Sequence, residues 1–327
     1  MKIQLKVLTP VHIGSGQEIS PIEYVCYDSK NKKICTKLNG DKFIRINMDE
    51  LFKDEEFKPL MEEFIKSAKS QRNIGGLLPQ DLLLHHTLYK IDISQTAKGS
   101  NLIAVKEFIK SVGRVYIPGS SLKGSILSGV IENILREKRI QKFENYRKHL
   151  GDVLSEITKQ LDRADMREFS HWLDIRDSNL KTPQEAIEIS QAEVVGARSR
   201  RRTTIPILYE TLKENSEFET EIISHCHKSE GEILKRADEF YRKVYKKERE
   251  FYQILPQVQK DSFLLRIGQG STAYSTSFLI LAEELRIKNY TIQRPRFHRV
   301  SGEPRTRRLI SGKKSMGWVE VKLCPEH

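Results

Sequence analysis

Residues 115–126, with the sequence VYIPGSSLKGSI, constrain the fold of this chain more than any other segment. An apolar run leads into Pro-Gly, two serines, a lysine and a second glycine. Apolar residues then recur at helical spacing from Ile126 to Leu135. This pattern predicts a strand, a tight turn and an amphipathic helix whose amino terminus lies at Ser120 or Ser121.

The turn in this segment has the features of a phosphate-binding site. The first N–H groups of a helix have no partner within the helix and carry a partial positive charge, which suits an anion. The order of residues is not that of a P-loop, because the lysine precedes the second glycine and no GK[ST] follows. A capped helix without a ligand is the alternative. The residues of this candidate site are Gly119, Ser120, Ser121, Lys123 and Gly124.

The charge of the chain favours a polyanionic partner. The sequence contains 56 Lys and Arg against 44 Asp and Glu, a net charge of +12, although solubility alone can account for some of it. Residues 286–314 contain ten basic residues and one acidic residue. Two groups of arginines are candidates for phosphate contacts, with a solvated charged surface as the alternative. They are Arg198, Arg200, Arg201 and Arg202 at the tip of an expected hairpin, and Arg305, Arg307 and Arg308 nearer the end of the chain.

We expect no metal, no cofactor and no membrane span. The four cysteines show no CxxC spacing, and His225-Cys226-His227 lacks the usual spacing of zinc ligands, so metal binding there stays open. No apolar run approaches the roughly 20 residues that a membrane helix requires. The first residues alternate like a strand and do not form the apolar core of a signal peptide. These features predict a cytoplasmic protein.

Strand patterns outnumber helical patterns along the chain. Alternating apolar residues predict strands at 2–7, 22–27, 33–38, 42–46, 88–93, 114–117, 172–177, 192–196, 207–209, 263–267 and 317–323. Helical spacing predicts helices at 49–70, 143–168 and 233–255, and another that begins near Ser275 or Thr276 after a glycine turn. The order of strand, glycine turn and helix therefore occurs twice.

This order predicts an α+β fold. We expect tandem ferredoxin-like or RRM-like domains with antiparallel sheets, glycine-rich loops and helical insertions. The expected domains are residues 1–223 and 224–327. We find no aromatic run of the kind with which RRM sheets stack on bases, so the glycine loops and basic hairpins are the expected binding surface.

Four stretches of sequence, taken in order, resemble the RAMP superfamily of CRISPR proteins. They are TPVHIGSG at residues 9–16, IPGSSLKG at 117–124, RIGQGS at 266–271, and PRTRRL at 304–309 with GWV at 317–319. The combination of the opening HIGSG with the closing TR..L and GWV is most similar to the family of fifth subunits of Csm, or type III-A, effector complexes. The resemblance covers nearly the whole chain.

The resemblance implies a function in antiviral defence. It implies binding to the 3′ region of the CRISPR RNA, capping of the filament made by the backbone RAMP subunit, contact with the small helical subunit, and assistance in crRNA maturation through recruited cellular nucleases. It also implies further RNA contacts from the two glycine motifs. Their residues are His12, Gly14, Ser15 and Gly16, and Gly268, Gln269, Gly270 and Ser271.

Three functions are compatible with these patterns. The first is a non-catalytic RNA-binding subunit of a ribonucleoprotein. The second is a metal-independent CRISPR RNA endonuclease that uses His12 and Lys123, because RAMP folds include such enzymes. A packed or capping histidine is the alternative for His12, since one histidine without a positioned partner is weak evidence for catalysis. The third is a protein-interaction module whose charge serves solubility.

Overall fold

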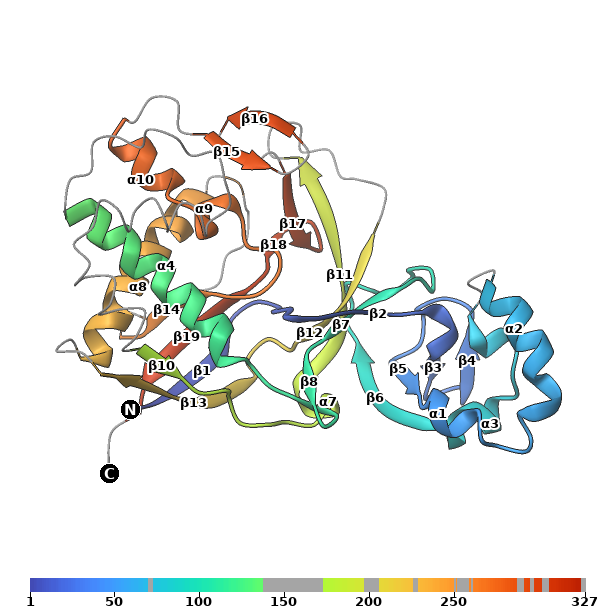
Figure 1. The fold of residues 1–327 in the computed structure, drawn as a ribbon. Coiled ribbons are helices and arrows are strands. Elements are labelled where there is room, and N and C mark those ends of the chain that lie inside the picture. Colours follow the sequence, from blue (N-terminus) through green and yellow to red (C-terminus); the bar gives the residue numbers. More distant parts are fainter. Residues whose placement is uncertain are drawn as a thin grey trace.

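Strands from both ends of the chain form an antiparallel sheet at the base of the molecule (Figure 1). The computed structural model describes residues 1–69, 73–137, 173–196, 206–225, 229–249, 251, 259, 261–286, 291–294, 297–301 and 306–324. The five strands of this sheet, in the order in which they lie, are β10 (Leu173–Ile175), β13 (Glu217–Ser224), β1 (Lys2–Val7), β19 (Trp318–Leu323) and β14 (Phe263–Arg266). In β1, Ile3, Leu5 and Val7 are fully buried, as their alternation predicts.

Two long helices cover this sheet and give it a ferredoxin-like arrangement. The chain runs β1, α4 (Gly119–Glu137), β10, β13, α8 (Glu230–Glu248), β14 and β19. The strands β10, β13, β1 and β19 lie in the order of the β-α-β-β-α-β motif, and β14 is added at one edge. A Cβ at Gly129 would lie 2.7 Å from the Cα of Ala237, so glycine lets α4 and α8 approach closely. The predicted α+β class with antiparallel, ferredoxin-like packing is confirmed.

A second, ten-stranded sheet occupies the middle of the molecule (Figure 1). Its strands are β2 (Gly14–Ile19), β7 (Val105–Phe108), β12 (Ile207–Leu212), β11 (Ile187–Gly196), β6 (Thr87–Ile93), β5 (Lys42–Ile46), β3 (Tyr24–Asp28) and β4 (Lys33–Cys35), with β17 (Thr306–Ile310) on β11 and β18 (Lys314–Ser315) on β17. Most pairs are antiparallel, but β6 and β11, and β7 and β12, are parallel.

One end of the second sheet carries a lobe with its own apolar core (Figure 1). The lobe contains α1 (Met48–Leu51), α2 (Met61–Lys69) and α3 (Gln80–His85), with the 3₁₀ turns η1 (Pro21–Glu23), η2 (Lys58–Leu60) and η3 (Ile74–Gly76). The prediction of one helix over residues 49–70 is wrong. The carboxylate of Asp54 accepts from the N–H of Glu56 and contacts Nε2 of His86 at 2.7 Å, which takes the chain out of the helix.

The expected division between residues 223 and 224 falls inside β13, ahead of its last residue. Strands from both sides of this point, β1 and β13 with β14 and β19, share the five-stranded sheet. The division stays a prediction, and it does not coincide with a break in the hydrogen bonding between strands. After β14, the helix predicted from Ser275 or Thr276 is instead two short ones, α9 (Ala273–Thr276) and α10 (Leu279–Glu284).

The remaining elements are short. They are α7 (Pro183–Ala186), the hairpin of β8 (Lys110–Ser111) and β9 (Arg114–Val115), and the hairpin of β15 (Thr291–Arg294) and β16 (Phe297–Ser301). The predicted helix at 143–168 lies outside the described residues. No described helix has the length and apolar character that crossing a membrane requires.

Candidate nucleic-acid interface

The first glycine motif changes from buried to exposed within a few residues. His12 and its two neighbours are buried, whereas all residues from Gly14 to Glu18 in β2 are exposed. β2 lies at the end of the ten-stranded sheet, and its register with β7 shifts between Gly14 and Glu18. Gly16 has a φ of +91°, a conformation that glycine adopts without strain. This motif therefore presents a glycine-containing edge strand to solvent.

The second glycine motif packs directly against the first. The N–H of Gln269 donates to the carbonyl oxygen of His12 at 2.7 Å. Gly268 has a φ of +74°, and a Cβ there would lie 2.3 Å from the same oxygen, so the position requires glycine. Gly270 also has a positive φ, +91°, and Ser271 Oγ donates to the carbonyl of Gly268 at 3.3 Å. Gln269 is exposed, so the turn offers its amide side chain to solvent.

A buried arginine holds this turn in place. Arg266 is 3% exposed and forms an ion pair of 2.8 Å with the buried carboxylate of Glu248. Its guanidinium also donates to the carbonyls of Gly270 at 3.1 Å and Met316 at 3.0 Å, and it lies over the ring of Trp318. Arg266 opens the RIGQGS motif, but neither its burial nor its ion pair was predicted from the sequence. The available signal was a lone arginine within the apolar strand pattern of residues 263–267.

The closing GWV motif, whose Trp318 contacts this arginine, is bonded to the opening motif. The N–H of Gly317 donates to the carbonyl of Pro10 at 3.0 Å, and the N–H of Trp318 donates to Thr9 Oγ1 at 3.1 Å. Gly317 has a φ of +95°, and a Cβ there would lie 2.4 Å from the carbonyl of Ile267. Motifs that are about 300 residues apart in the sequence are thus bonded to each other through their backbones.

The amino terminus of α4 differs from the prediction. The helix begins at Gly119, ahead of Ser120 and Ser121, and the N–H of Gly119 donates to Oδ1 of Asp177 at 2.8 Å. A carboxylate from a distant loop therefore already occupies part of the predicted phosphate site. A Cβ at Gly119 would also lie 2.0 Å from the carbonyl of Ile175, so this glycine serves packing.

The rest of the predicted phosphate site is partly accessible. Ser120 and Gly124 are exposed, and Ser121 is half-buried. Nζ of Lys123 lies 3.7 Å from Asp174, and its side chain keeps 31% of its exposure. Two residues further along α4, Ser125 Oγ donates to the carbonyl of Arg266 at 3.1 Å, which ties α4 to the second glycine motif.

The predicted arginine groups fall largely outside the described residues. Arg198, Arg200, Arg201, Arg202 and Arg305 all lie there. Arg307 is 3% exposed, and its guanidinium lies 4.8 Å from the ring centre of Phe251 and 5.8 Å from that of Tyr274. The prediction that Arg307 contacts a phosphate is therefore corrected, because aromatic packing holds its side chain inside. Arg308, its half-buried neighbour, points to the other face of β17.

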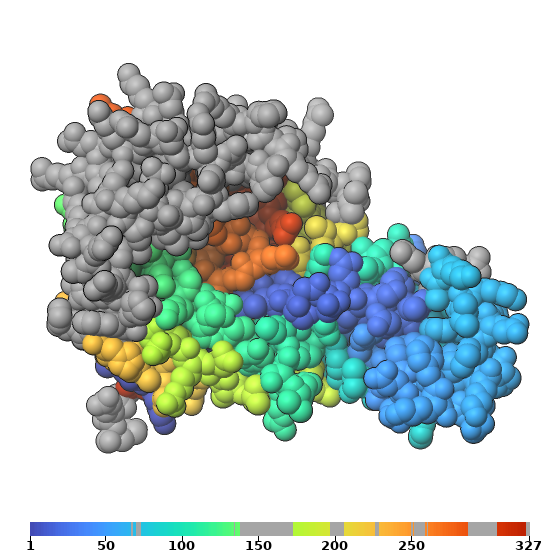
Figure 2. All heavy atoms as spheres, viewed as in Figure 1, coloured from blue at the N-terminus to red at the C-terminus, as the bar shows by residue number. Residues whose placement is uncertain are grey.

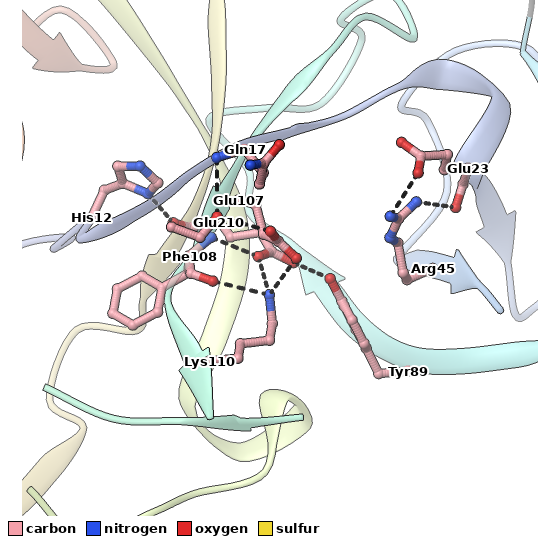
Figure 3. A network of polar contacts seen from close by, with 10 residues as sticks. His12, Gln17, Glu23, Arg45, Tyr89, Glu107, Phe108, Lys110 and Glu210 are labelled. Atoms are coloured by element: carbon pink, nitrogen blue, oxygen red, sulfur yellow. Dashed lines mark hydrogen bonds and ion pairs between the residues drawn. The ribbon is translucent and has the colours of Figure 1, made fainter. Parts of the chain in front are cut away.

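His12 is part of a buried polar network (Figure 3). Its Nδ1 lies 2.8 Å from the carbonyl oxygen of Glu210, and its ring packs edge-on against Phe108 and Tyr209. Because a carbonyl only accepts, Nδ1 carries the proton and Nε2 is the unprotonated nitrogen of the neutral ring. Burial, with a smaller contribution from nearby cations, lowers the pKa of His12 to about 4.

The carboxylate of Glu210 is the centre of the same network (Figure 3). It accepts from Tyr89 Oη at 2.7 Å, from the N–H of Phe108 at 2.9 Å and from Lys110 Nζ at 2.6 Å. Burial and the adjacent carboxylate raise the pKa of Tyr89. The network joins β6, β7 and β12 beneath the exposed β2. The ion pair of Glu210 and Lys110 was not predicted, because nothing in a strand pattern identifies a buried ion pair.

The two residues of the predicted endonuclease have separate surroundings. The cations that act on His12 are Lys106, Lys110 and Arg308. Lys123 lies instead beside Asp174. Cleavage at the 2′-hydroxyl needs an acid and a base on opposite sides of one phosphate, and Lys123 is not among the cations that act on the buried His12.

The carboxylate of Asp174 also lies 3.2 Å from Nε2 of His225. Cys226 and His227 lie outside the described residues. Within the part of the chain that the structure describes, no group of three or more His, Cys, Asp or Glu side chains could hold a metal ion.

The two glycine motifs form one exposed surface, which we call the glycine surface. It consists of Gly14, Ser15, Gly16, Gln17 and Gln269. Figure 2 shows the blue start of the chain, the green segment of α4 and the orange segment after β14 adjoining on one face. The motifs at 9–16, 117–124, 266–271 and 317–319 therefore meet at or beneath one surface, whereas Pro304 and Arg305 of the remaining motif lie outside the described residues.

Comparisons with known proteins identify the family. The model of the RAMP superfamily matches residues 4–273. Two curated relatives are similar: the CRISPR system Cms protein Csm5 of Streptococcus thermophilus, 24% identical over 308 residues (89% of this chain and 83% of the relative), and that of Methanocaldococcus jannaschii, 26% identical over 190 residues. The second match covers 54% of this chain and 42% of the relative's own length.

Solved structures show the same fold. A chain in a cryo-EM structure of a Csm–crRNA–target RNA ternary complex of a type III-A CRISPR-Cas system superposes with a TM-score of 0.69 at 23% identity, over 98% of this chain and 100% of that one. The crystal structure of T. onnurineus Csm5 gives a TM-score of 0.65 at 21% identity, over 97% and 99%. The predicted resemblance is confirmed. Since the family model spans most of its residues, the chain belongs to the RAMP superfamily.

Proposed function

We propose that the protein is a non-catalytic, RNA-binding subunit of a type III-A CRISPR ribonucleoprotein. It binds the 3′ region of the CRISPR RNA across the glycine surface. The observation that carries the proposal is the convergence of the glycine motifs, which are distant in sequence, on one exposed surface held by backbone hydrogen bonds. The similarity to Csm5 relatives supports the assignment to this type of complex.

The glycine surface suits a sugar-phosphate backbone for two physical reasons. Its glycines lack side chains, so a strand of RNA can approach the protein backbone closely. Arg308 is half-buried on β17 and lies near enough to His12, the buried residue of the first glycine motif, to affect its pKa. A cation in this position can contact a phosphate.

The proposal includes assembly as an end subunit. The protein caps the filament of the backbone RAMP subunit, contacts the small helical subunit, and assists crRNA maturation through recruited cellular nucleases. Support comes from a structural neighbour that is a chain of a Csm–crRNA–target RNA complex. The division of the chain at residues 223 and 224, and phosphate contacts from Ser120 and Lys123, belong to the same proposal.

Equilibrium binding to single-stranded RNA tests the RNA-binding surface. Affinity should fall with salt at a slope of about −0.7 per phosphate contact, so Arg308→Gln should flatten the slope by up to roughly that amount. Lys53→Gln removes the same charge from the lobe, next to α1, and should leave the slope unchanged. An Arg308 variant that keeps the wild-type slope would exclude a phosphate contact by this residue.

Incubation of the protein with repeat-containing RNA in the presence of a chelator tests the proposal that the protein does not cleave RNA. We expect intact RNA, because His12 is buried and has no positioned catalytic partner among the described residues. Discrete cleavage that disappears in His12→Ala would instead establish the endonuclease.

A further inference from the structure

One nitrogen of His12 has no assigned role in the network beneath the glycine surface. His12 is 1% exposed, and its Nδ1 is used by the carbonyl of Glu210. Nε2 is then a hydrogen-bond acceptor, and within the described part of the chain it has no hydrogen-bond partner. Nε2 is not among the described side-chain atoms that are both fully buried and unpaired, so it keeps some contact with solvent, and a ligand can take the place of water there.

The ring is held so that Nε2 stays in one place. Phe108 and Tyr209 pack against it at ring-centre distances of 6.1 Å and 4.8 Å. The hydrogen bond from Nδ1 fixes the rotation of the imidazole about the Cβ–Cγ bond. Figure 3 shows the imidazole next to the Glu210 backbone at the end of the network. The low pKa of His12 keeps Nε2 unprotonated at neutral pH.

The position of Nε2 relative to the glycine surface is set by Gly14. A Cβ at Gly14 would lie 3.1 Å from Nε2, so the space that a side chain would fill opens over this nitrogen. Gly14 is exposed and its φ is not positive, so an alanine could adopt its backbone conformation. The absence of a side chain here therefore gives access to Nε2 and is not a requirement of the turn.

We propose that Nε2 of His12 accepts a hydrogen bond from a ribose 2′-hydroxyl of the bound strand and makes the glycine surface selective for RNA over DNA. The inference rests on the proposed function and adds a specificity determinant to it. The 2′-hydroxyl is the group that distinguishes RNA from DNA, and a fixed acceptor beneath a backbone-binding surface can detect it at any base. Deoxyribose cannot supply this hydrogen bond, so its loss lowers affinity.

A scan of the RNA with single 2′-fluoro nucleotides tests this inference. A 2′-fluorine keeps the ribose conformation close to that of RNA but cannot donate a hydrogen bond. With the full-length protein, we expect one position of a short single-stranded RNA at which the substitution weakens wild-type binding roughly three- to tenfold, the range of one net hydrogen bond.

Two variants connect that position to His12. His12→Asn keeps a side-chain N–H for the Glu210 carbonyl but lacks Nε2, and Gly14→Ala places a methyl group over Nε2. Both should bind unmodified RNA more weakly and lose their sensitivity at that position. Gly76→Ala, at an exposed glycine of the lobe with open space around it, is the matched control and should keep the wild-type response.

The outcomes separate this inference from the proposed function. If no 2′-fluoro position weakens wild-type binding, or if the sensitive position is equally sensitive in Gly14→Ala and His12→Asn, the inference is wrong although RNA binding stands. If the wild-type protein does not bind single-stranded RNA at all, the proposed function itself is wrong. Should His12→Asn fail to fold, the wild-type scan and Gly14→Ala still decide the question.

Discussion

Replacement of Gly268 by alanine tests whether the second glycine motif is held against the first. The structure gives two separate costs. A φ of +74° costs a non-glycine residue about 1–2 kcal/mol, and a Cβ 2.3 Å from the carbonyl oxygen of His12 would displace the Gln269 N–H bond to that oxygen, which costs about 1 kcal/mol more. We therefore expect Gly268→Ala to lower the free energy of unfolding by about 2–3 kcal/mol.

Two other glycines separate these costs. Gly16 has a φ of +91° with nothing within 4 Å of a Cβ, so Gly16→Ala should show the conformational cost alone. Gly76 has neither a positive φ nor a neighbour at that distance, and Gly76→Ala should change stability little. Urea unfolding followed by circular dichroism measures all three. A Gly268→Ala cost no larger than that of Gly16→Ala would refute the claim that the turn is fixed by contact with His12.

Three further predictions concern the supports of the surface. Asp177→Ala should lower the free energy of unfolding, measured with urea, by about 1 kcal/mol because α4 loses its cap. An increase in RNA affinity in the same variant would show that a phosphate can replace this carboxylate. Glu248→Gln should cost about 3–5 kcal/mol because it leaves Arg266 buried without its counter-ion, and a thermal shift within experimental error would contradict this. The folded-state pKa of His12 is about 4, below its ordinary value of 6.5, so between these values the unfolded state binds a proton that the folded state does not. The contribution of His12 to the free energy of unfolding is therefore complete above pH 6.5 and falls by about 3 kcal/mol as the pH drops towards 4. The free energy of unfolding, measured from pH 7 to pH 4, should therefore decline less steeply in His12→Asn than in the wild type. Equal declines in the two proteins would contradict the lowered pKa of His12.

Much of the fold follows from local patterns in the sequence. The alternation in residues 2–7 and 317–323 reflects strands with one buried face, and the structure has β1 and β19 there. Helical spacing after residue 118 reflects the face of α4 that packs on α8 and the sheet. Such patterns say which face is buried but not which strand is the neighbour. The pairing of β1 with β19 across the whole chain, and the sharing of one sheet by both expected domains, therefore came only from the structure.

The candidate site was predictable in its glycines and less so in its charged residues. Glycines at positive φ or in close contact, such as Gly268 and Gly317, leave a clear mark in the sequence. Long-range partners do not: the Asp177 cap on α4 and the burial of Arg307 against Phe251 depend on segments far away in the chain. A cation in a basic stretch looks the same in the sequence whether it faces solvent or an aromatic ring.

Ultraviolet crosslinking of the protein to a short single-stranded RNA, with the crosslinked peptides identified by mass spectrometry, tests the central claim most directly. The account predicts crosslinks in the peptides that contain Gly14–Gln17 and Gln269, which are far apart in sequence and adjacent in the structure. Crosslinks confined to the lobe of α1, α2 and α3, with none at either glycine motif, would contradict it.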